Sequence, residues 1–187
     1  MAKKQYIPTK GEDFFCVPTV LSMILESEGI TLSLDEIISD FKYNLPNDYV
    51  ISPNIKNYEY TTDEKKWGIL MDRNTINDFF QKRNLPFAEM YIPINTIAEY
   101  NFCDMLNTAI SNNNHVVFGY DYRRLHENTK SEIGHISLVS RVVSGEVVEI
   151  IDPGPKNWGL KQVPLFDMYS AIRAWNDGLW IIQRKKE

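Results

Sequence analysis

The part of the sequence that most restricts the fold begins at Cys16 and reads CVPTVLSMILESEG through Gly29. Its valine, methionine, isoleucine and leucine residues recur at the spacing of one helical face. Pro18 has no backbone N–H, so a helix tolerates it only in the first turn. Glycine commonly follows the last residue of a helix. We therefore expect a helix from Cys16 to about Glu28, with Gly29 as its stop.

A thiol at the start of a helix has a distinctive environment. The first N–H groups of a helix lack partners within it, and the positive end of the macrodipole lies there. Both effects favour the thiolate, the nucleophilic form of cysteine. Cys16 is therefore a candidate nucleophile. The alternative is that Cys16 is a small buried hydrophobic residue beside Phe14 and Phe15.

A second candidate lies in the run Gly134-His135-Ile136-Ser137-Leu138-Val139, which alternates as a half-buried strand does. The alternation places His135, Ser137 and Val139 on one face. A general base needs a fixed position, and a strand holds a histidine rigidly. Gly134 leaves space beside it for a substrate chain. The alternative is a core or edge histidine that is bonded to a carbonyl group.

A third candidate, Asp152, follows a hairpin. Two β-rich runs flank the tight turn Ser144-Gly145, so the second run returns beside the first. Asp152 then approaches His135, where its carboxylate could fix the imidazole tautomer and stabilise an imidazolium. The alternative is a turn residue, because aspartate before Pro153-Gly154 is ordinary turn chemistry.

Taken together, Cys16, His135 and Asp152 meet the requirements of nucleophilic catalysis by a Cys–His–Asp set. In cysteine enzymes that assemble their sites in space, the thiol and the base are far apart in the sequence. The three residues occur here in that order and with that separation.

The remaining patterns predict one α+β domain over residues 1–187, with helices first and antiparallel strands last. Residues 42–67 are polar and contain prolines, which indicates an irregular surface segment that can lie over a site. A loop is expected over residues 152–160. The expected helices are Cys16–Glu28, a short helix that follows the capping box Ser33–Glu36 and ends near Asp40, Asp72–Arg83, Phe102–Ile110 and Leu165–Ala174, and the expected strands are Phe87–Ile92, His115–Tyr122, Ile133–Val143, Glu146–Ile151 and Leu179–Ile182.

Composition excludes several classes of function. The chain has 187 residues, with 20 basic and 25 acidic side chains, a net charge of −5 and a pI near 5.3. A general nucleic-acid binder needs a basic face, so we expect no nucleic acid as partner. Two cysteines make no disulfide framework, and no apolar run approaches the roughly 18 residues of a membrane span. We therefore expect a cytoplasmic protein that contacts no membrane.

Other residues that could carry chemistry are given structural roles. We expect His115 to be a strand-end residue, His126 to lie on the surface of a polar loop, and Cys103 to pack in the core. No Cys-x-x-Cys, His-x-x-x-His or Cys-x-x-His spacing occurs, and no Gly-rich phosphate loop is present. The sequence therefore predicts neither a metal nor another cofactor.

The segment that begins at Cys16 resembles the nucleophile helix of the bacteriocin-processing (C39) family of papain-like cysteine peptidases and their stand-alone relatives. In that family the helix opens with a Cys-Gly-Pro-Ala-like sequence. Residues 115–122, 134–139 and 147–153 resemble the family's successive strands, and Trp180-Ile181-Ile182 fits the last one. The resemblance covers most of the chain outside about residues 42–66. It implies a papain-like α+β fold with a cleft between helices and sheet.

The resemblance also implies roles: Cys16 as nucleophile, His135 as base and acid, and Asp152 as the orienting residue. The chain departs from the family at two points. Val17 replaces the usual glycine, and the oxyanion-hole glutamine that precedes the cysteine is missing. Lys10 lies six residues before the cysteine and Gln5 eleven before it, so these two are the candidate oxyanion donors, together with the N–H of Cys16.

The expected activity is hydrolysis of peptide or amide bonds through a thioester acyl-enzyme. Acyl transfer in a biosynthetic pathway is an alternative, because it uses the same thiol and base and differs only in the acceptor. A catalytically inactive module that holds an extended peptide is a third interpretation, favoured by the missing glutamine. The expected partner is a peptide or an acyl substrate, and the sequence leaves the oligomeric state open.

Overall fold

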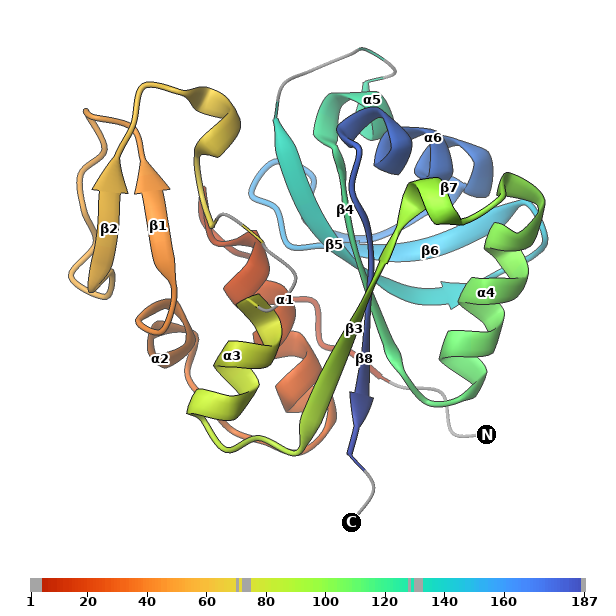
Figure 1. Cartoon of the computed structure of the whole chain (residues 1–187), viewed down its shortest axis with the longest axis horizontal. Coiled ribbons are helices and arrows are strands. Elements are labelled where there is room, and N and C mark those ends of the chain that lie inside the picture. The colour runs from red at the N-terminus through yellow and green to blue at the C-terminus, as the bar shows by residue number, and fades with distance from the viewer. Residues whose placement is uncertain (1–4, 70, 72–74, 128, 130–132, 186–187) are drawn as a thin grey trace.

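The computed structural model describes residues 5–69, 71, 75–127, 129 and 133–185 (Figure 1). Its helices are α1 (Cys16–Ser27), α2 (Leu34–Ile38), α3 (Thr75–Lys82), α4 (Glu99–Ser111), α5 (Tyr122–His126) and α6 (Leu165–Trp175), with the 3-10 turns η1 (Glu64–Lys66) and η2 (Ile94–Thr96). Its strands are β1 (Lys42–Leu45), β2 (Asn57–Tyr60), β3 (Phe87–Pro93), β4 (His115–Asp121), β5 (Gly134–Val142), β6 (Val147–Asp152), β7 (Gly159–Pro164) and β8 (Gly178–Arg184). Within these described ranges, no helix combines the length and the apolar character needed to cross a bilayer.

The main sheet of the described residues is antiparallel and has the strand order β3-β8-β4-β5-β6-β7. Strands β1 and β2 form a separate parallel pair beside α2, at the left of Figure 1. Because β5 lies between β4 and β6, its first residues adjoin the end of β4 and the end of β6. That corner of the sheet is where the candidate site lies.

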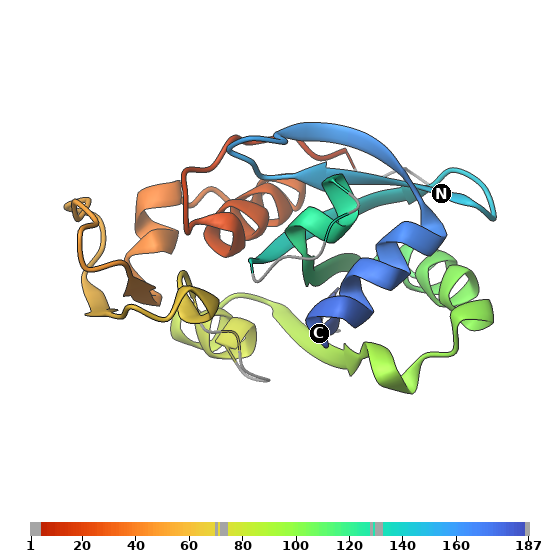
Figure 2. The ribbon, with the colours of Figure 1, turned by 90° about the horizontal axis from the view of Figure 1, so that it is seen from above.

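The two faces of the main sheet carry separate hydrophobic clusters. Along β4, Val117 belongs to the cluster that contains α1, whereas Val116 and Phe118 belong to the cluster that contains α4 and α6. This alternation follows from strand geometry. Figure 2 shows α1 and α6 on opposite sides of the sheet. The first cluster packs α1 against β5 and thereby brings the start of the helix to the start of the strand.

Most sequence-based expectations for the fold are confirmed. The class is α+β, α1 begins at Cys16, and β5 and β6 form the expected hairpin. The capping box is present, since the Ser33 hydroxyl accepts the N–H of Glu36 at 3.2 Å and the Glu36 carboxylate accepts the N–H of Ser33 at 2.9 Å. The helix expected from Asp72 corresponds to α3, and residues 72–74 lie outside the described residues.

Three segments differ from expectation. Residues 42–67 are not wholly irregular, because they contain β1 and β2, and Tyr43 and Leu45 are fully buried. The alternation of a four-residue strand is too short to recognise among asparagines and prolines. Strand β7 begins within the segment expected to be a loop, and it pairs with β6. Helix α5 follows β4 directly, because the Asp121 carboxylate caps it by accepting the N–H of Arg124 at 3.0 Å.

Candidate active site

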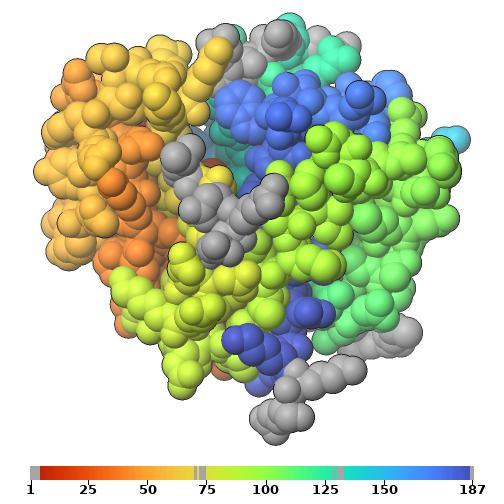
Figure 3. All heavy atoms as spheres, viewed as in Figure 1, coloured from red at the N-terminus to blue at the C-terminus, as the bar shows by residue number. Residues whose placement is uncertain are grey.

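A cavity of about 430 Å³ lies between the helical part of the chain and the main sheet. Its walls come from the start of α1, from η1 and the residues after it, from the start of β5, and from the turn between α6 and β8. Figure 3 shows the hollow from outside, between the yellow segment of residues 60–68 and the blue segment that contains α6. Cys16, His135, Trp175 and Asp177 are among the lining residues.

Cys16 is the first residue of α1 and is half-buried. The chain reaches this position through Phe14, whose φ of 72° lies in the left-handed region that non-glycine residues seldom occupy. The rings of Tyr49 and Trp67 pack edge-on against Phe14, with centroid distances of 5.2 and 6.1 Å, and hold the tight approach in place. The sequence therefore places the thiol at a fixed helix start that faces the cavity.

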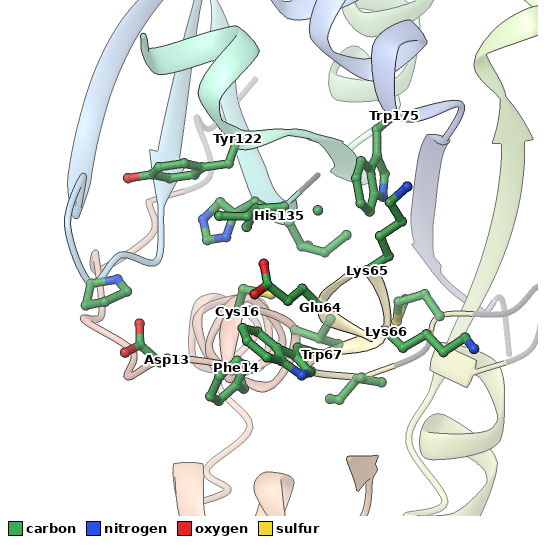
Figure 4. Close-up of a pocket in the computed structure, with 18 of the residues that line it drawn as sticks. Asp13, Phe14, Cys16, Glu64, Lys65, Lys66, Trp67, Tyr122, His135 and Trp175 are labelled. Carbon is green, nitrogen blue, oxygen red and sulfur yellow. The ribbon is translucent and has the colours of Figure 1, made fainter. Parts of the chain in front are cut away.

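His135 and Asp152 lie on neighbouring strands. Leu138 pairs with Ile151, so Asp152 stands opposite Ser137, two residues from His135 and on the same face. The Nε2 of His135 lies 2.9 Å from Oδ1 of Asp152. This contact uses one ring nitrogen and leaves the other for Cys16. Figure 4 shows His135 and Cys16 on facing walls of the cavity.

The surroundings of His135 favour the protonated imidazole. Burial by itself would lower its pKa, but hydrogen bonds to Asp152 and Cys16 outweigh that effect and raise the pKa to about 9. The rings of Tyr120 and Tyr122 lie edge-on to the imidazole, with centroids at 5.5 and 5.2 Å. At neutral pH the Cys16 sulfur therefore faces a cation whose position is fixed on two sides.

Asp152 is fully buried and has donors at both of its oxygens. Oδ2 lies 2.9 Å from Nε2 of His126 and accepts the Tyr120 hydroxyl at 3.4 Å, while Oδ1 also accepts the N–H of Gly154 at 2.9 Å. Burial raises the pKa of Asp152, but the hydrogen bonds from His126 and His135 lower it well below its usual range. The carboxylate therefore stays ionised.

His126 corrects the sequence-based interpretation. It was expected on the surface, yet only 7% of its side chain is exposed and its imidazole binds Asp152. The expectation was wrong because α5 folds the chain back over the end of β4, and the rings of Tyr120 and Tyr122 cover the imidazole. The aspartate that opens this segment, Asp121, is a helix-capping signal that could have indicated the turn.

Gly134 lines the cavity as expected, but the space beside it is not open. A Cβ at this position would lie 2.5 to 2.7 Å from ring atoms of Trp175. The absence of a side chain therefore admits the indole of Trp175 against the backbone next to His135. The correction arises because Trp175 is distant in sequence, at the end of α6, so local pattern gives no sign of this contact.

The two oxyanion candidates do not meet the cavity. Gln5 and Lys10 are exposed and are not among the lining residues. Tyr6, next to Gln5, places its hydroxyl 2.8 Å from Nδ1 of His115, at the opposite end of β4 from the residues that pair with His135. Five residues of extended strand span about 17 Å, so Gln5 is anchored far from the thiol.

The start of α1 offers other donors. The backbone N–H groups of Cys16 and Val17 have no backbone acceptor among the described residues. The N–H of Thr19 is already bonded to the carbonyl of Phe15, at 3.0 Å. Pro18 carries no N–H. Two unpaired N–H groups therefore adjoin the sulfur and could hold an oxyanion.

The other candidates from the sequence lie elsewhere. His115 is buried at the start of β4, where Glu28 and Tyr6 bind its ring. Cys103 lies on α4 and packs against the cluster of α4 and α6, as expected for a core residue. No group of three or more His, Cys, Asp or Glu side chains is arranged for a metal ion among the residues that the structure describes.

No known family profile matches the sequence, and no curated protein matches it either. The fold does match a solved structure from Bacillus anthracis that is provisionally assigned as a C39-like peptidase. The match has a TM-score of 0.62, covers 98% of this chain and 96% of that one, and joins sequences that are 16% identical. The chain thus has the fold of a C39-like peptidase, and the resemblance inferred from its sequence is confirmed at the level of fold.

Proposed function

We propose that the protein is a cysteine-dependent hydrolase of peptide or amide bonds. One observation carries the proposal: the thiol of Cys16 and the Asp152-bound imidazole of His135 line the same cavity, in a chain with a C39-like peptidase fold. Binding alone would not require a thiol at a helix start, an imidazole beside it and a buried carboxylate behind the imidazole. Nucleophilic catalysis uses all three: the thiol attacks, the imidazole transfers the proton, and the carboxylate orients the imidazole.

In the first step, the sulfur of Cys16 attacks the carbonyl carbon of the scissile bond. The carbonyl oxygen gains the negative charge, and the unpaired N–H groups of Cys16 and Val17 stabilise it. The bond to nitrogen then breaks, and His135 gives its proton to the departing amine. The products of this step are a free amine and a thioester between the acyl group and Cys16.

In the second step, water attacks the thioester and His135 accepts a proton from that water. The sulfur leaves as the carboxylic acid forms, and the proton on His135 remains beside the regenerated thiolate. Asp152 keeps the imidazole in one orientation through both steps, because its carboxylate holds Nε2 at 2.9 Å. Acyl transfer would differ only in replacing water by another acceptor.

Alkylation by iodoacetamide tests the activation of the thiol without any knowledge of the substrate. At pH 6 we expect Cys16 to react at least about tenfold faster than Cys103. Cys103 is a matched internal control, because it is also half-buried but lies on α4, where Asn107 contacts its sulfur. His135→Ala is expected to remove the advantage of Cys16 and to leave the rate at Cys103 unchanged. Equal rates for both cysteines in the wild type would contradict the proposal.

A library of internally quenched peptides tests hydrolysis itself. We expect cleavage that Cys16→Ser lowers by roughly 10³-fold or more and that Cys103→Ser leaves unchanged. In water enriched in oxygen-18, hydrolysis places the label in the new carboxyl group, whereas transfer to an added amine does not. Thiol-dependent transfer without labelled acid would favour the acyltransferase, and peptide binding with no Cys16-dependent reaction would favour the binding module.

A further inference from the structure

Asp177 occupies a fixed position between α6 and β8. Its N–H bonds the carbonyl of Ile172 at 3.2 Å, and its carbonyl accepts the N–H of Ile94 at 2.9 Å. The preceding residue, Asn176, ends α6 in the left-handed conformation with φ of 56°. The side chain of Asp177 is largely buried and lines the same cavity as Cys16. The backbone of Asp177 is therefore fixed by hydrogen bonds to α6 and to η2.

Gly119, in the middle of β4, has no side chain, and the carboxylate of Asp177 fills the space that a side chain would occupy. A Cβ at Gly119 would meet the carboxylate, with Cγ of Asp177 at 2.7 Å, and would lie 3.1 Å from the ring of Trp180. The φ of Gly119 is not in the left-handed region, so backbone conformation does not explain the glycine. The space is needed for the acid.

No cation balances the carboxylate of Asp177 in the part of the chain that the structure describes. Its hydrogen bonds come from the hydroxyl of Tyr91, at 3.1 Å from Oδ1, and from the N–H of Gly178. Burial raises the pKa of Asp177 to about 6, although both hydrogen bonds act to lower it. At pH 7.5 the group is therefore mostly ionised, with the cost of desolvation and without a salt bridge to offset it.

The carboxylate lines the same cavity as the reacting groups. Gly119 pairs with Ile136, the residue after His135. Ile136 faces the cluster that includes α1, whereas the alternation of β5 turns His135 to the other face. Adjacent strands are about 4.8 Å apart, so Asp177 lies one strand away from the residue that follows His135. The indole of Trp175 also lines the cavity, against Gly134, where it can cover the alkyl part of a bound side chain.

We propose that Asp177 is a specificity-determining residue that binds an ammonium or guanidinium group of the substrate, so that the protein acts on peptides or amides with a basic side chain near the scissile bond. The inference rests on the proposed function for the identity of the reacting bond. An arriving cation pairs with the carboxylate of Asp177 at the cavity wall and supplies the Coulombic partner that the described residues do not provide.

The other charges of the cavity do not substitute for Asp177. Glu12, Asp13 and Glu64 are exposed, so water screens them, and the lining lysines Lys65, Lys66 and Lys156 are exposed as well. Exposed ion pairs contribute little to binding because solvent competes for each charge. A basic side chain therefore gains most from the one acid that water reaches least.

The inference is tested by measuring peptide binding to the Cys16→Ala variant, in which the reacting thiol is absent. The probes are acetylated and amidated hexaglycine peptides in which one lysine replaces each position in turn, and the same peptides with ε-acetyllysine. At pH 7.5, by titration calorimetry, we expect at least one lysine peptide to bind about tenfold or more tightly than its acetylated counterpart. Adding Asp177→Asn is expected to abolish this preference, because the isosteric amide has no charge.

Two further variants separate position from charge. Glu64→Gln removes a carboxylate from another part of the cavity wall and is expected to keep the lysine preference. Gly119→Ala leaves Asp177 charged but displaces it, and is expected to lose the preference. Circular dichroism identifies any variant that fails to fold. If Gly119→Ala does not fold, the result with Asp177→Asn is sufficient to test the inference.

The outcomes distinguish the inference from the proposed function. The role of Asp177 would be overturned by any of three results. Cys16→Ala shows no lysine preference, the preference stays the same when Asp177→Asn is added, or Glu64→Gln reduces the preference as much as Asp177→Asn does. If instead the preference follows Asp177 but iodoacetamide does not distinguish Cys16 from Cys103, the proposed hydrolysis fails and the cation site stands.

Discussion

The two largely buried carboxylates of the cavity region, Asp152 at the end of β6 and Asp177 before β8, have opposite surroundings. Asp152 is held by His126, His135 and the N–H of Gly154, and these donors overcome desolvation and lower its pKa. Asp177 accepts from the Tyr91 hydroxyl and from one backbone N–H, and its desolvation raises the pKa to about 6. Asp152 has a cationic partner within the protein, whereas Asp177 has none among the residues that the structure describes.

The difference shows how the fold distributes stability and function around one cavity. A paired carboxylate contributes to folding because the native state favours its charged form. A partly buried carboxylate without a cationic partner costs stability when it ionises, and such a cost persists where the charge serves a ligand. Asp152 therefore stabilises the site as it orients His135, whereas Asp177 destabilises the free protein.

The largest effect is expected from Asp152→Asn. An amide cannot replace the carboxylate that fixes the imidazole, so we expect thiol-dependent cleavage to fall by roughly 10³- to 10⁴-fold, as in other triads. The folded-state pKa lies below the ordinary value, so the stability from Asp152 is present above about pH 4 and is lost as pH falls through the folded-state pKa. The measurements are kcat/KM and urea unfolding, with the exposed Asp167→Asn as a control for the rate. A loss of less than tenfold would refute the role of Asp152.

Unlike Asp152→Asn, Asp177→Asn is expected to raise the free energy of unfolding near neutral pH. The pKa of Asp177 is raised from 3.8 to about 6, so ionisation costs folded-state stability as pH rises through that range. The variant should gain up to roughly 3 kcal/mol in free energy of unfolding at pH 7.5, since one pKa unit corresponds to about 1.4 kcal/mol. The gain should vanish near pH 3.5. Urea unfolding at both pH values checks this, and a less stable variant at pH 7.5 would break the comparison.

A smaller loss is expected from His126→Ala. Without the imidazole, Oδ2 of Asp152 keeps only the Tyr120 hydroxyl at 3.4 Å, so one oxygen of the buried carboxylate is left with a single long hydrogen bond. We expect the free energy of unfolding to fall by about 1–3 kcal/mol. His126→Gln can donate an N–H from a similar position and should recover part of the loss. Equal stability of His126→Ala and wild type would show that Asp152 does not depend on this donor.

The smallest effect is expected from Tyr91→Phe. The change removes the hydroxyl that donates to Oδ1 of Asp177, so the pKa of Asp177 should rise above its present value of about 6. The midpoint is read from the carboxyl carbon shift of Asp177 in a pH titration by NMR. We expect the free energy of unfolding to change by about 1 kcal/mol. A lower pKa for Asp177 in this variant would contradict the hydrogen bond as described.

The sequence could indicate Cys16, His135 and Asp152 because each lies where a local pattern changes. Pro18 limits how far upstream the helix can begin, which places the cysteine at its first position. The alternation of β5 and the turn after it set the hairpin, and the observed register brings Asp152 within reach of His135. These constraints act between residues that are close in the sequence, so they can be recognised in the local sequence pattern.

The sequence could not indicate Asp177 or His126 in the same way, because their surroundings come from distant elements. Asp177 stands in what reads as an ordinary turn, and its environment depends on Tyr91 and Gly119 from two other strands. The oxyanion candidates failed for a similar reason, since the anchor of Tyr6 on His115 directs the N-terminal segment away from the cavity.

By itself, the sequence determined the α+β class, the helix that starts at Cys16 and the hairpin between His135 and Asp152, because periodicity, turn residues and proline constrain neighbouring positions directly. Tertiary structure alone decided that Asp152 is paired with histidines and that Asp177 has no cation beside it in the described part of the chain, and it closed the space beside Gly134 with Trp175. Burial and charge balance depend on packing between residues far apart in the chain, and no local pattern records that packing.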